Sequence, residues 1–102
     1  MKYGLAGTTI DQIVAVFTQY PEIEKAVIYG SRAKGNYKAG SDIDLTLYGD
    51  ELTFDLRSTI ASALDDLSLP YSIDLSIFNT LTHVGLRDHI ERVGVLFYER
   101  RA

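Results

Sequence analysis

Two segments in which apolar and polar residues strictly alternate, 42–48 and 71–77, constrain the fold more than any other feature of this sequence. Alternation with a period of two is typical of a β-strand that buries one face. Between them, residues 51–67 carry leucine, isoleucine and alanine at helical spacing, and Pro70 separates this helix from the second strand. A strand, a helix and a strand in this order favour a right-handed crossover between two parallel strands.

Shorter patterns predict the remaining elements and complete a single domain over residues 1–102. They are a first helix from Thr8 or Thr9 to about Tyr20, a strand over 25–30, a short helix from Ser31, a last helix from Asn79 or Thr80 to about Val93, and a final strand or packed tail over 95–98. The order predicts an α/β (α+β) fold in which helices flank a small mixed β-sheet.

Three aspartates are expected on one face of this sheet. Gly30 ends one strand and Asp42 begins the next, so bringing them together makes those two strands antiparallel. Asp42 and Asp44 lie early in their strand, and Asp74 lies in the first half of the parallel neighbour. Parallel pairing would therefore hold the three carboxylates side by side.

The composition narrows the class of ligand. The chain has 102 residues, a net charge of −4 and no cysteine, and no apolar run approaches the length of about 20 residues that a membrane span needs. With no signal-peptide pattern at the N-terminus, we expect a cytoplasmic protein. The main basic cluster is short and consists of Arg32, Lys34 and Lys38. It favours a small anionic ligand and argues against nucleic acid as a partner.

Carboxylates in this arrangement are typical ligands of Mg²⁺. Asp42 and Asp44 are two residues apart in an extended chain, so their Cα atoms are roughly 6–7 Å apart and their charges repel unless something neutralises them. Hard divalent cations take carboxylate oxygens and leave positions for water and phosphate. Asp74 adds enough ligands for one firmly held ion and for a second that the substrate helps to hold.

The Gly30-Ser31 step predicts a phosphate-binding turn beside these carboxylates. Glycine between a strand and a helix lets backbone come close to phosphate oxygens, and the first amides of a helix are unpaired donors. The candidate phosphate-binding residues are Gly30, Ser31, Arg32, Lys34 and Ser41. Gly35 and Gly40 would let the connecting loop fold back toward the aspartate strand.

Each of these features has a simpler interpretation when taken alone. A Gly-Ser step after a strand is common, Ser41-Asp42 could cap a turn, and Asp74 could be an exposed residue on a polar strand face. The conjunction of all three in one short chain is what favours a nucleoside triphosphate and metal site. His83 and His89 are six residues apart and not on one helix face, so we interpret them as solvated surface.

The pattern Gly-Ser-x-Ala-x-Gly, followed by Ser-Asp-x-Asp-Leu and a third aspartate on a later strand, resembles the DNA polymerase beta-like nucleotidyltransferase superfamily. In size the chain is similar to the smallest branch, the minimal nucleotidyltransferases. This resemblance implies transfer of a nucleoside monophosphate, with ATP as the favoured donor, to a hydroxyl group by two Mg²⁺ ions. It implies that Gly30 and Ser31 lie at the phosphates, and that Asp42, Asp44 and Asp74 bind the metals and carry out catalysis.

The resemblance also implies a protein partner. Larger members carry a helical domain for which 102 residues leave no room, so we expect a partner subunit to supply that wall of the pocket. Minimal nucleotidyltransferases are commonly paired with all-helical HEPN toxins as antitoxins in type VII-like pairs, and some members adenylylate a tyrosine of the toxin. The expected assembly is a hetero-oligomer. The alternative is an antitoxin that binds nucleotide without catalysis and masks its partner; polynucleotide synthesis is disfavoured by the acidic composition.

Overall fold

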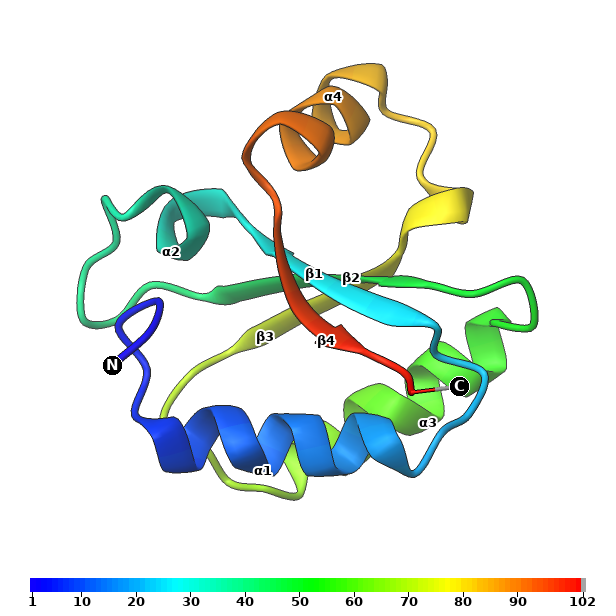
Figure 1. Ribbon diagram of the computed structural model, residues 1–102, viewed down its shortest axis with the longest axis horizontal. Coiled ribbons are helices and arrows are strands. Elements are labelled where there is room, and N and C mark those ends of the chain that lie inside the picture. The colour runs from blue at the N-terminus through cyan, green and yellow to red at the C-terminus, as the bar shows by residue number, and fades with distance from the viewer. Residues whose placement is uncertain (102) are drawn as a thin grey trace.

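A four-stranded mixed sheet forms the centre of the computed structural model, which describes residues 1–101. Strands β1 (Lys25–Tyr29), β2 (Ile43–Tyr48), β3 (Ile73–Ile77) and β4 (Val95–Glu99) lie in the order β3-β2-β1-β4 (Figure 1). Strand β1 runs antiparallel to β2 and β4, whereas β2 and β3 are parallel. The predicted mixed sheet and both predicted strand pairings are confirmed, and the C-terminal segment is an edge strand.

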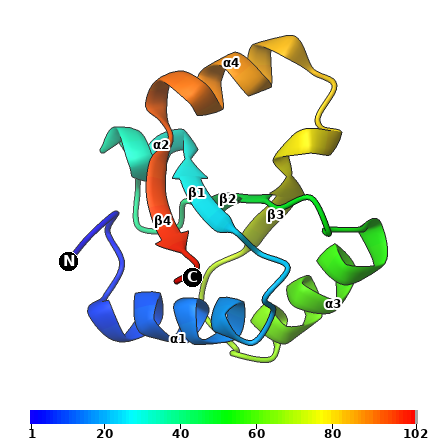
Figure 2. The same cartoon turned by 45° about the vertical axis from the view of Figure 1, so that its right-hand side comes forward.

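Helices cover the two faces of the sheet as separate layers. Helices α1 (Gly7–Thr18) and α3 (Phe54–Asp65) lie together on one face. The other face carries the short α2 (Gly30–Lys34) and α4 (Val84–Val93), and the 3-10 turn Phe78–Thr80 leads from β3 toward α4 (Figures 1 and 2). The sheet is therefore the middle layer of three.

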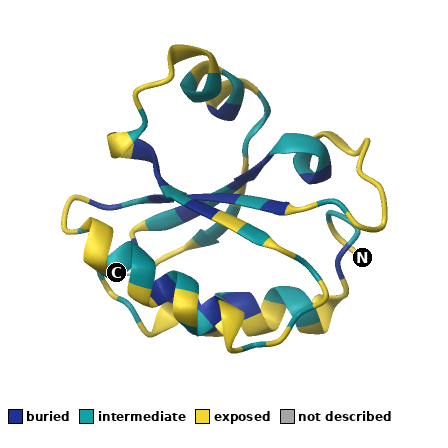
Figure 3. Ribbon diagram, turned by 180° about the vertical axis from the view of Figure 1, so that it is seen from behind, coloured by how far each residue is buried: buried dark blue, intermediate teal, exposed yellow. Residues whose placement is uncertain are grey.

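The main core lies between the sheet and the α1–α3 layer. Apolar side chains of the strands, including Ile28 and Leu45, are fully buried there with Phe17 of α1 and Ile60 of α3. Figure 3 shows this buried band from behind. On the opposite face, β2 presents its polar residues, so only a small cluster around Tyr29, Phe78 and Ile90 is buried beneath α4. The α4 layer therefore leaves part of a polar sheet face open.

Helix α3 begins later than the sequence pattern predicted. We expected it from residue 51, but it starts at Phe54, because the Thr53 side chain accepts a hydrogen bond from the Leu56 amide at 3.1 Å and caps the helix there. Helix α1 spans Gly7–Thr18, and so begins before the predicted Thr8 or Thr9 cap and ends before Tyr20.

Helix α4 also begins later than predicted. Asn79 and Thr80, the expected caps, lie in the 3-10 turn that follows β3. The helix begins at Val84, where Nδ1 of His83 accepts a hydrogen bond from the Leu86 amide at 3.0 Å. A histidine ring therefore serves as the cap, a role that serine or threonine usually has. Among residues 1–101, no helix combines the length and the apolar character needed to cross a bilayer.

The buried β2 face makes a stability prediction. Leu45→Ala removes a fully buried side chain and should lower the free energy of unfolding by about 2–5 kcal/mol through lost burial and an internal cavity. Leu96→Ala is the matched control, because Leu96 is 50% exposed on the edge strand β4, and it should cost less than about 1.5 kcal/mol. Urea unfolding measures both, and equal losses would contradict this assignment of the core.

Candidate active site

The parallel pairing of β2 and β3 brings the aspartates together. Asp44 and Asp74 are direct register partners, so their side chains leave the same face of the sheet. Asp42 lies two residues before Asp44, just outside β2, and the amide of the intervening Ile43 donates to the Ser72 carbonyl at 2.9 Å. Asp42 and Asp74 are exposed and Asp44 is partly buried. The predicted placement of the three carboxylates on one face is confirmed; their catalytic roles stay a prediction.

The surroundings of Asp44 shift the pKa of its carboxyl group. Burial raises the pKa of its carboxyl group, and the negative charges of Asp74 and Asp42 raise that pKa further. His89, above the sheet on α4, acts in the opposite direction. Within residues 1–101 no lysine or arginine forms an ion pair with any of the three aspartates. A cation bound here would relieve a repulsion that the fold itself creates.

The glycine turn lies directly against Asp44. Gly30 has a left-handed φ of +73°, and a Cβ atom at this position would overlap the Oδ2 atom of Asp44. Glycine is therefore required here by its backbone conformation and by the closeness of the carboxylate. No side chain caps the N-terminus of α2, so its first amides are free to receive an anion next to the carboxylates.

The other predicted phosphate-binding residues lie in different environments. Ser31 is the second residue of α2 and is partly exposed, whereas Lys34 is exposed at the end of the same helix. The Ser41 hydroxyl accepts a hydrogen bond from the Lys38 amide at 2.8 Å and so closes a turn. Arg32 is 2% exposed and its guanidinium donates to backbone carbonyls of the loop and the N-terminal segment. For Arg32 and Ser41 this geometry favours a structural role over contact with phosphate.

Two residues next to the aspartates were not among the predicted site residues. His89 is partly buried, and its ring meets the Tyr29 ring edge-on with centroids 6.2 Å apart. Our interpretation of His89 as solvated surface is therefore wrong, and the spacing of Leu86, His89, Ile90 and Val93 along one helical stripe was the signal for it. His83 is exposed as expected, although its ring caps α4.

Tyr29 is the second of these residues. It pairs with Asp44 across the antiparallel strands and is almost fully buried. Burial raises the pKa of its hydroxyl, a hydrogen bond with Ser76 lowers it, and the charges of Asp74 and Asp44 raise it. The phenol therefore stays neutral and forms part of the polar floor beside the aspartates.

The donor set fits a hard divalent cation. It consists of three carboxylates on one face, with a repulsion that already acts on Asp44 and with free backbone donors beside them for an anion. Among residues 1–101, no three acidic or histidine side chains have converged to metal-binding distance. Binding of an ion would therefore require side-chain rotation, for which the exposed Asp42 and Asp74 have room.

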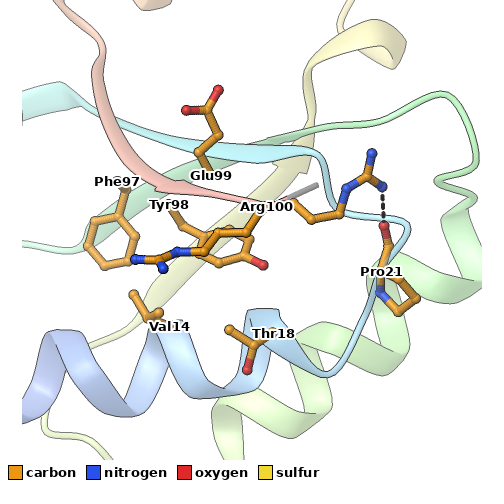
Figure 4. Close-up of a pocket in the computed structure, with 8 residues that line it drawn as sticks. Val14, Thr18, Pro21, Phe97, Tyr98, Glu99 and Arg100 are labelled. Atoms are coloured by element: carbon orange, nitrogen blue, oxygen red, sulfur yellow. Dashed lines mark hydrogen bonds between the residues drawn. The ribbon is translucent and has the colours of Figure 1, made fainter.

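A separate groove of about 640 Å³ lies between α1 and β4 (Figure 4). Val14, Pro21 and Phe97 are among its walls, and the Arg100 side chain donates a hydrogen bond to the Pro21 carbonyl at its end. The groove is lined from the α1 side of the sheet, whereas the aspartates face α4. Its single carboxylate, Glu99, makes it unsuitable for a polycarboxylate metal site.

Comparison with known proteins identifies the family of this chain. Residues 11–102 match the family described as polymerase beta nucleotidyltransferase. The chain belongs to this family. It is 32% identical over 100 residues to a Haemophilus influenzae protein named probable protein adenylyltransferase MntA, and the match covers 97% of this chain and 81% of that protein. The nucleotidyltransferase resemblance and the fold class expected from the sequence are thereby confirmed.

Solved structures share the fold of this chain. A toxin–antitoxin crystal structure with AMP-PNP superposes with a TM-score of 0.73 and 20% identity, covering 90% of this chain and 74% of that one. A complex of a tri-AMPylated Shewanella oneidensis HEPN toxin with an MNT antitoxin gives a TM-score of 0.67 and 18% identity, covering 91% of this chain and 71% of that one. At these identities the likeness establishes a common architecture.

Gly30 and Gly35 provide a test of the contact with Asp44. Both have left-handed φ values, +73° and +89°, but an added Cβ meets nothing within 4 Å at Gly35. Gly30→Ala and Gly35→Ala should each lower the free energy of unfolding by about 1–2 kcal/mol through backbone strain. Only Gly30→Ala should also reduce Mn²⁺-dependent nucleotide binding measured by calorimetry, because it displaces the Asp44 carboxylate. Equal binding by both variants would contradict the role of this contact.

The raised pKa of Asp44 predicts a pH-dependent stability. The folded protein binds a proton at Asp44 more readily than the unfolded chain, so this residue destabilises the fold as the pH rises through its folded pKa. Asp44→Asn should therefore raise stability at pH 7 in the presence of EDTA, by less than about 1 kcal/mol because solvent screens the partly exposed group. The gain should vanish on acidification to below the pKa of the unfolded carboxyl.

Thermal unfolding at several pH values measures this difference between Asp44→Asn and the wild type. Asp11→Asn is the control, because Asp11 is an exposed carboxylate on α1 and should give no such gain. A gain for Asp44→Asn that is independent of pH would show that ionisation of Asp44 is not its cause.

Proposed function

We propose that this chain transfers AMP from ATP to a hydroxyl group of a partner protein, with two Mg²⁺ ions held by Asp42, Asp44 and Asp74. The observation that supports this most directly is the contact between the Gly30 turn and the Asp44 carboxylate. In this proposal the first amides of α2 are the donors for a phosphate chain and the neighbouring carboxylates are the ligands for a cation, the two parts that nucleotidyl transfer requires. Membership of the nucleotidyltransferase family supports the same reaction class.

The residues of the site have separable roles in this reaction. The first amides of α2 and the Ser31 hydroxyl would bind and orient the triphosphate, while the glycine at position 30 keeps side-chain atoms out of the way. Asp42 and Asp44 would hold the cations, and Asp74 would lie nearest the acceptor hydroxyl and assist its deprotonation. When bound, Mg²⁺ neutralises phosphate charge and lowers the pKa of a coordinated hydroxyl.

Nucleotidyl transfer by this site balances as an in-line displacement. The acceptor oxygen forms a bond to the α-phosphorus of ATP, the bond from that phosphorus to the bridging oxygen of the β-phosphate breaks, and pyrophosphate leaves. The proton of the acceptor hydroxyl passes to a carboxylate of the site or to solvent. In this proposal these groups would lie on the open polar face between α2 and α4.

We further propose that the acceptor is a tyrosine of a cognate HEPN toxin, that this chain acts as the antitoxin, and that the two form a hetero-oligomer in the cytoplasm. The 32% identical relative is named as a protein adenylyltransferase, and one solved structure of the same fold pairs an MNT antitoxin with a tri-AMPylated HEPN toxin. The open polar face beside the aspartates supports a partner that completes the pocket.

A second candidate is an antitoxin that binds nucleotide and neutralises its partner by masking. It is favoured by the open polar face beside the aspartates, which a partner would cover with or without transfer. A mask needs no metal-assisted step, so its neutralising effect would not depend on the aspartates.

Incubation of the chain and its HEPN partner with ATP labelled at the α-phosphate, in the presence of Mg²⁺, separates the two candidates. Asp42→Asn and Asp44→Asn should reduce label transfer at least about 100-fold, because each removes a metal ligand needed in the transition state. Asp88→Asn is the control, since Asp88 pairs with Arg92 on the exposed surface of α4. Neutralisation that survives in both site variants without label transfer would establish masking and refute the transferase proposal.

A further inference from the structure

Arg32 is a buried cation whose surroundings point to a role in building the site. It lies two residues after Gly30, is 2% exposed, and forms no ion pair with an acidic group among residues 1–101. Burying a charge without a counter-charge is costly unless hydrogen bonds satisfy it. In this structure backbone carbonyls accept the hydrogen bonds of the guanidinium, and aromatic rings pack near it. The guanidinium therefore holds backbone segments together.

Two of these hydrogen bonds hold the peptide bond that precedes Asp42. The Arg32 Nε and Nη2 atoms both donate to the Ser41 carbonyl, at 3.0 and 2.9 Å. This bidentate contact fixes the peptide plane between Ser41 and Asp42. Nη2 also lies 3.3 Å from the Ala39 carbonyl. Asp42 itself lies outside the β2 ladder. The Arg32 guanidinium therefore helps to fix the backbone position from which the Asp42 side chain extends.

The same guanidinium ties in two more segments. Its Nη1 atom donates to the Tyr3 carbonyl at 2.8 Å, across 29 residues of sequence. The Cζ atom of the guanidinium lies 4.8 Å from the centroid of the Tyr71 ring and 5.4 Å from that of the Tyr37 ring. Tyr71 is followed by Ser72, whose carbonyl accepts the Ile43 amide where β3 pairs with β2. One side chain therefore connects the N-terminal turn, the loop before Asp42 and the entry to the Asp74 strand.

We propose that Arg32 is a positioning residue of the proposed transfer reaction, which it serves by fixing the Ser41–Asp42 peptide and not by contacting the triphosphate. This inference rests on the proposed function for its effect on catalysis, but its structural part does not. Each nitrogen atom of the guanidinium already donates to a backbone carbonyl. Its planar group also packs near the rings of Tyr37 and Tyr71. A lysine keeps the charge but has no planar fork to hold the same carbonyls.

Amide hydrogen exchange tests the structural part of this proposal. The Lys38 amide donates to the Ser41 hydroxyl, and the Ser41 amide donates to the Lys38 carbonyl at 3.0 Å, so both report on the turn that Arg32 holds. In Arg32→Gln and Arg32→Lys these amides should exchange at least about tenfold faster than in the wild type, while core amides of β1 and β2 are unchanged. Lys34→Gln, which removes an exposed charge from the same helix, should leave the exchange unchanged.

Wild-type exchange rates in Arg32→Lys would overturn the proposal, because charge alone would then suffice. This variant also decides the question if Arg32→Gln does not fold. Acceleration in both Arg32 variants, but not in Lys34→Gln, supports it.

Kinetics with ATP and the HEPN partner test the catalytic part. In Arg32→Lys the Mg²⁺ concentration for half-maximal transfer should rise about tenfold, while KM for ATP at saturating Mg²⁺ stays within about twofold, because an ion ligand is displaced and no phosphate contact is lost. A raised KM for ATP in Arg32→Gln that Arg32→Lys restores would show a phosphate contact and overturn the proposal. If the wild type transfers no AMP, the proposed function fails, and the exchange comparison still decides whether Arg32 holds the loop.

Discussion

The site of this protein depends on the antiparallel pairing of β1 and β2. Tyr29, the last residue of β1, pairs with Asp44, so the chain must turn away directly above the aspartate strand. It does so through a left-handed glycine whose backbone touches the Asp44 carboxylate. A residue with a side chain would be strained at this φ and would displace the carboxylate. The Gly30 turn and the carboxylates are thus made adjacent by one register of hydrogen bonds.

The parallel pairing of β2 and β3 adds the second constraint. The register of these strands places Asp74 directly opposite Asp44. Helix α3 provides the crossover that parallel strands need. Burial raises the pKa of Asp44, and the nearby charge of Asp74 raises it further. Without metal the protein therefore holds like charges close together on a partly covered sheet face. The apolar core on the α1–α3 side provides the burial that keeps the sheet in this register.

The two faces of the sheet consequently have different tasks. One face is apolar and buries the strands against two helices, whereas the other carries aspartates, serine and threonine beneath the smaller α4 layer. The thin cover on the polar face is consistent with a site that a macromolecular substrate approaches from outside. The groove between α1 and β4 belongs to the opposite side and has no part in this arrangement.

The sequence by itself determined the strands, the mixed sheet and the placement of the three aspartates, because alternation along 42–48 and 71–77 reports directly which side chains share a face. It also indicated a turn at Gly30, for approach of the backbone to phosphate. The left-handed φ and the closeness to Asp44 that require glycine there are features of the folded chain.

Only the tertiary structure decided the environments of Arg32 and His89 and the start of α4. Arg32 is buried because Tyr3 and Tyr71, which are far away in sequence, come to lie around it. His89 acts on Asp44 because α4 packs over the polar face of the sheet. The start of α4 follows from a 3-10 turn after β3 that displaces the expected caps. Contacts between distant segments are not encoded in local periodicity, so residue type and spacing alone could not distinguish a buried structural arginine from an exposed ligand for phosphate.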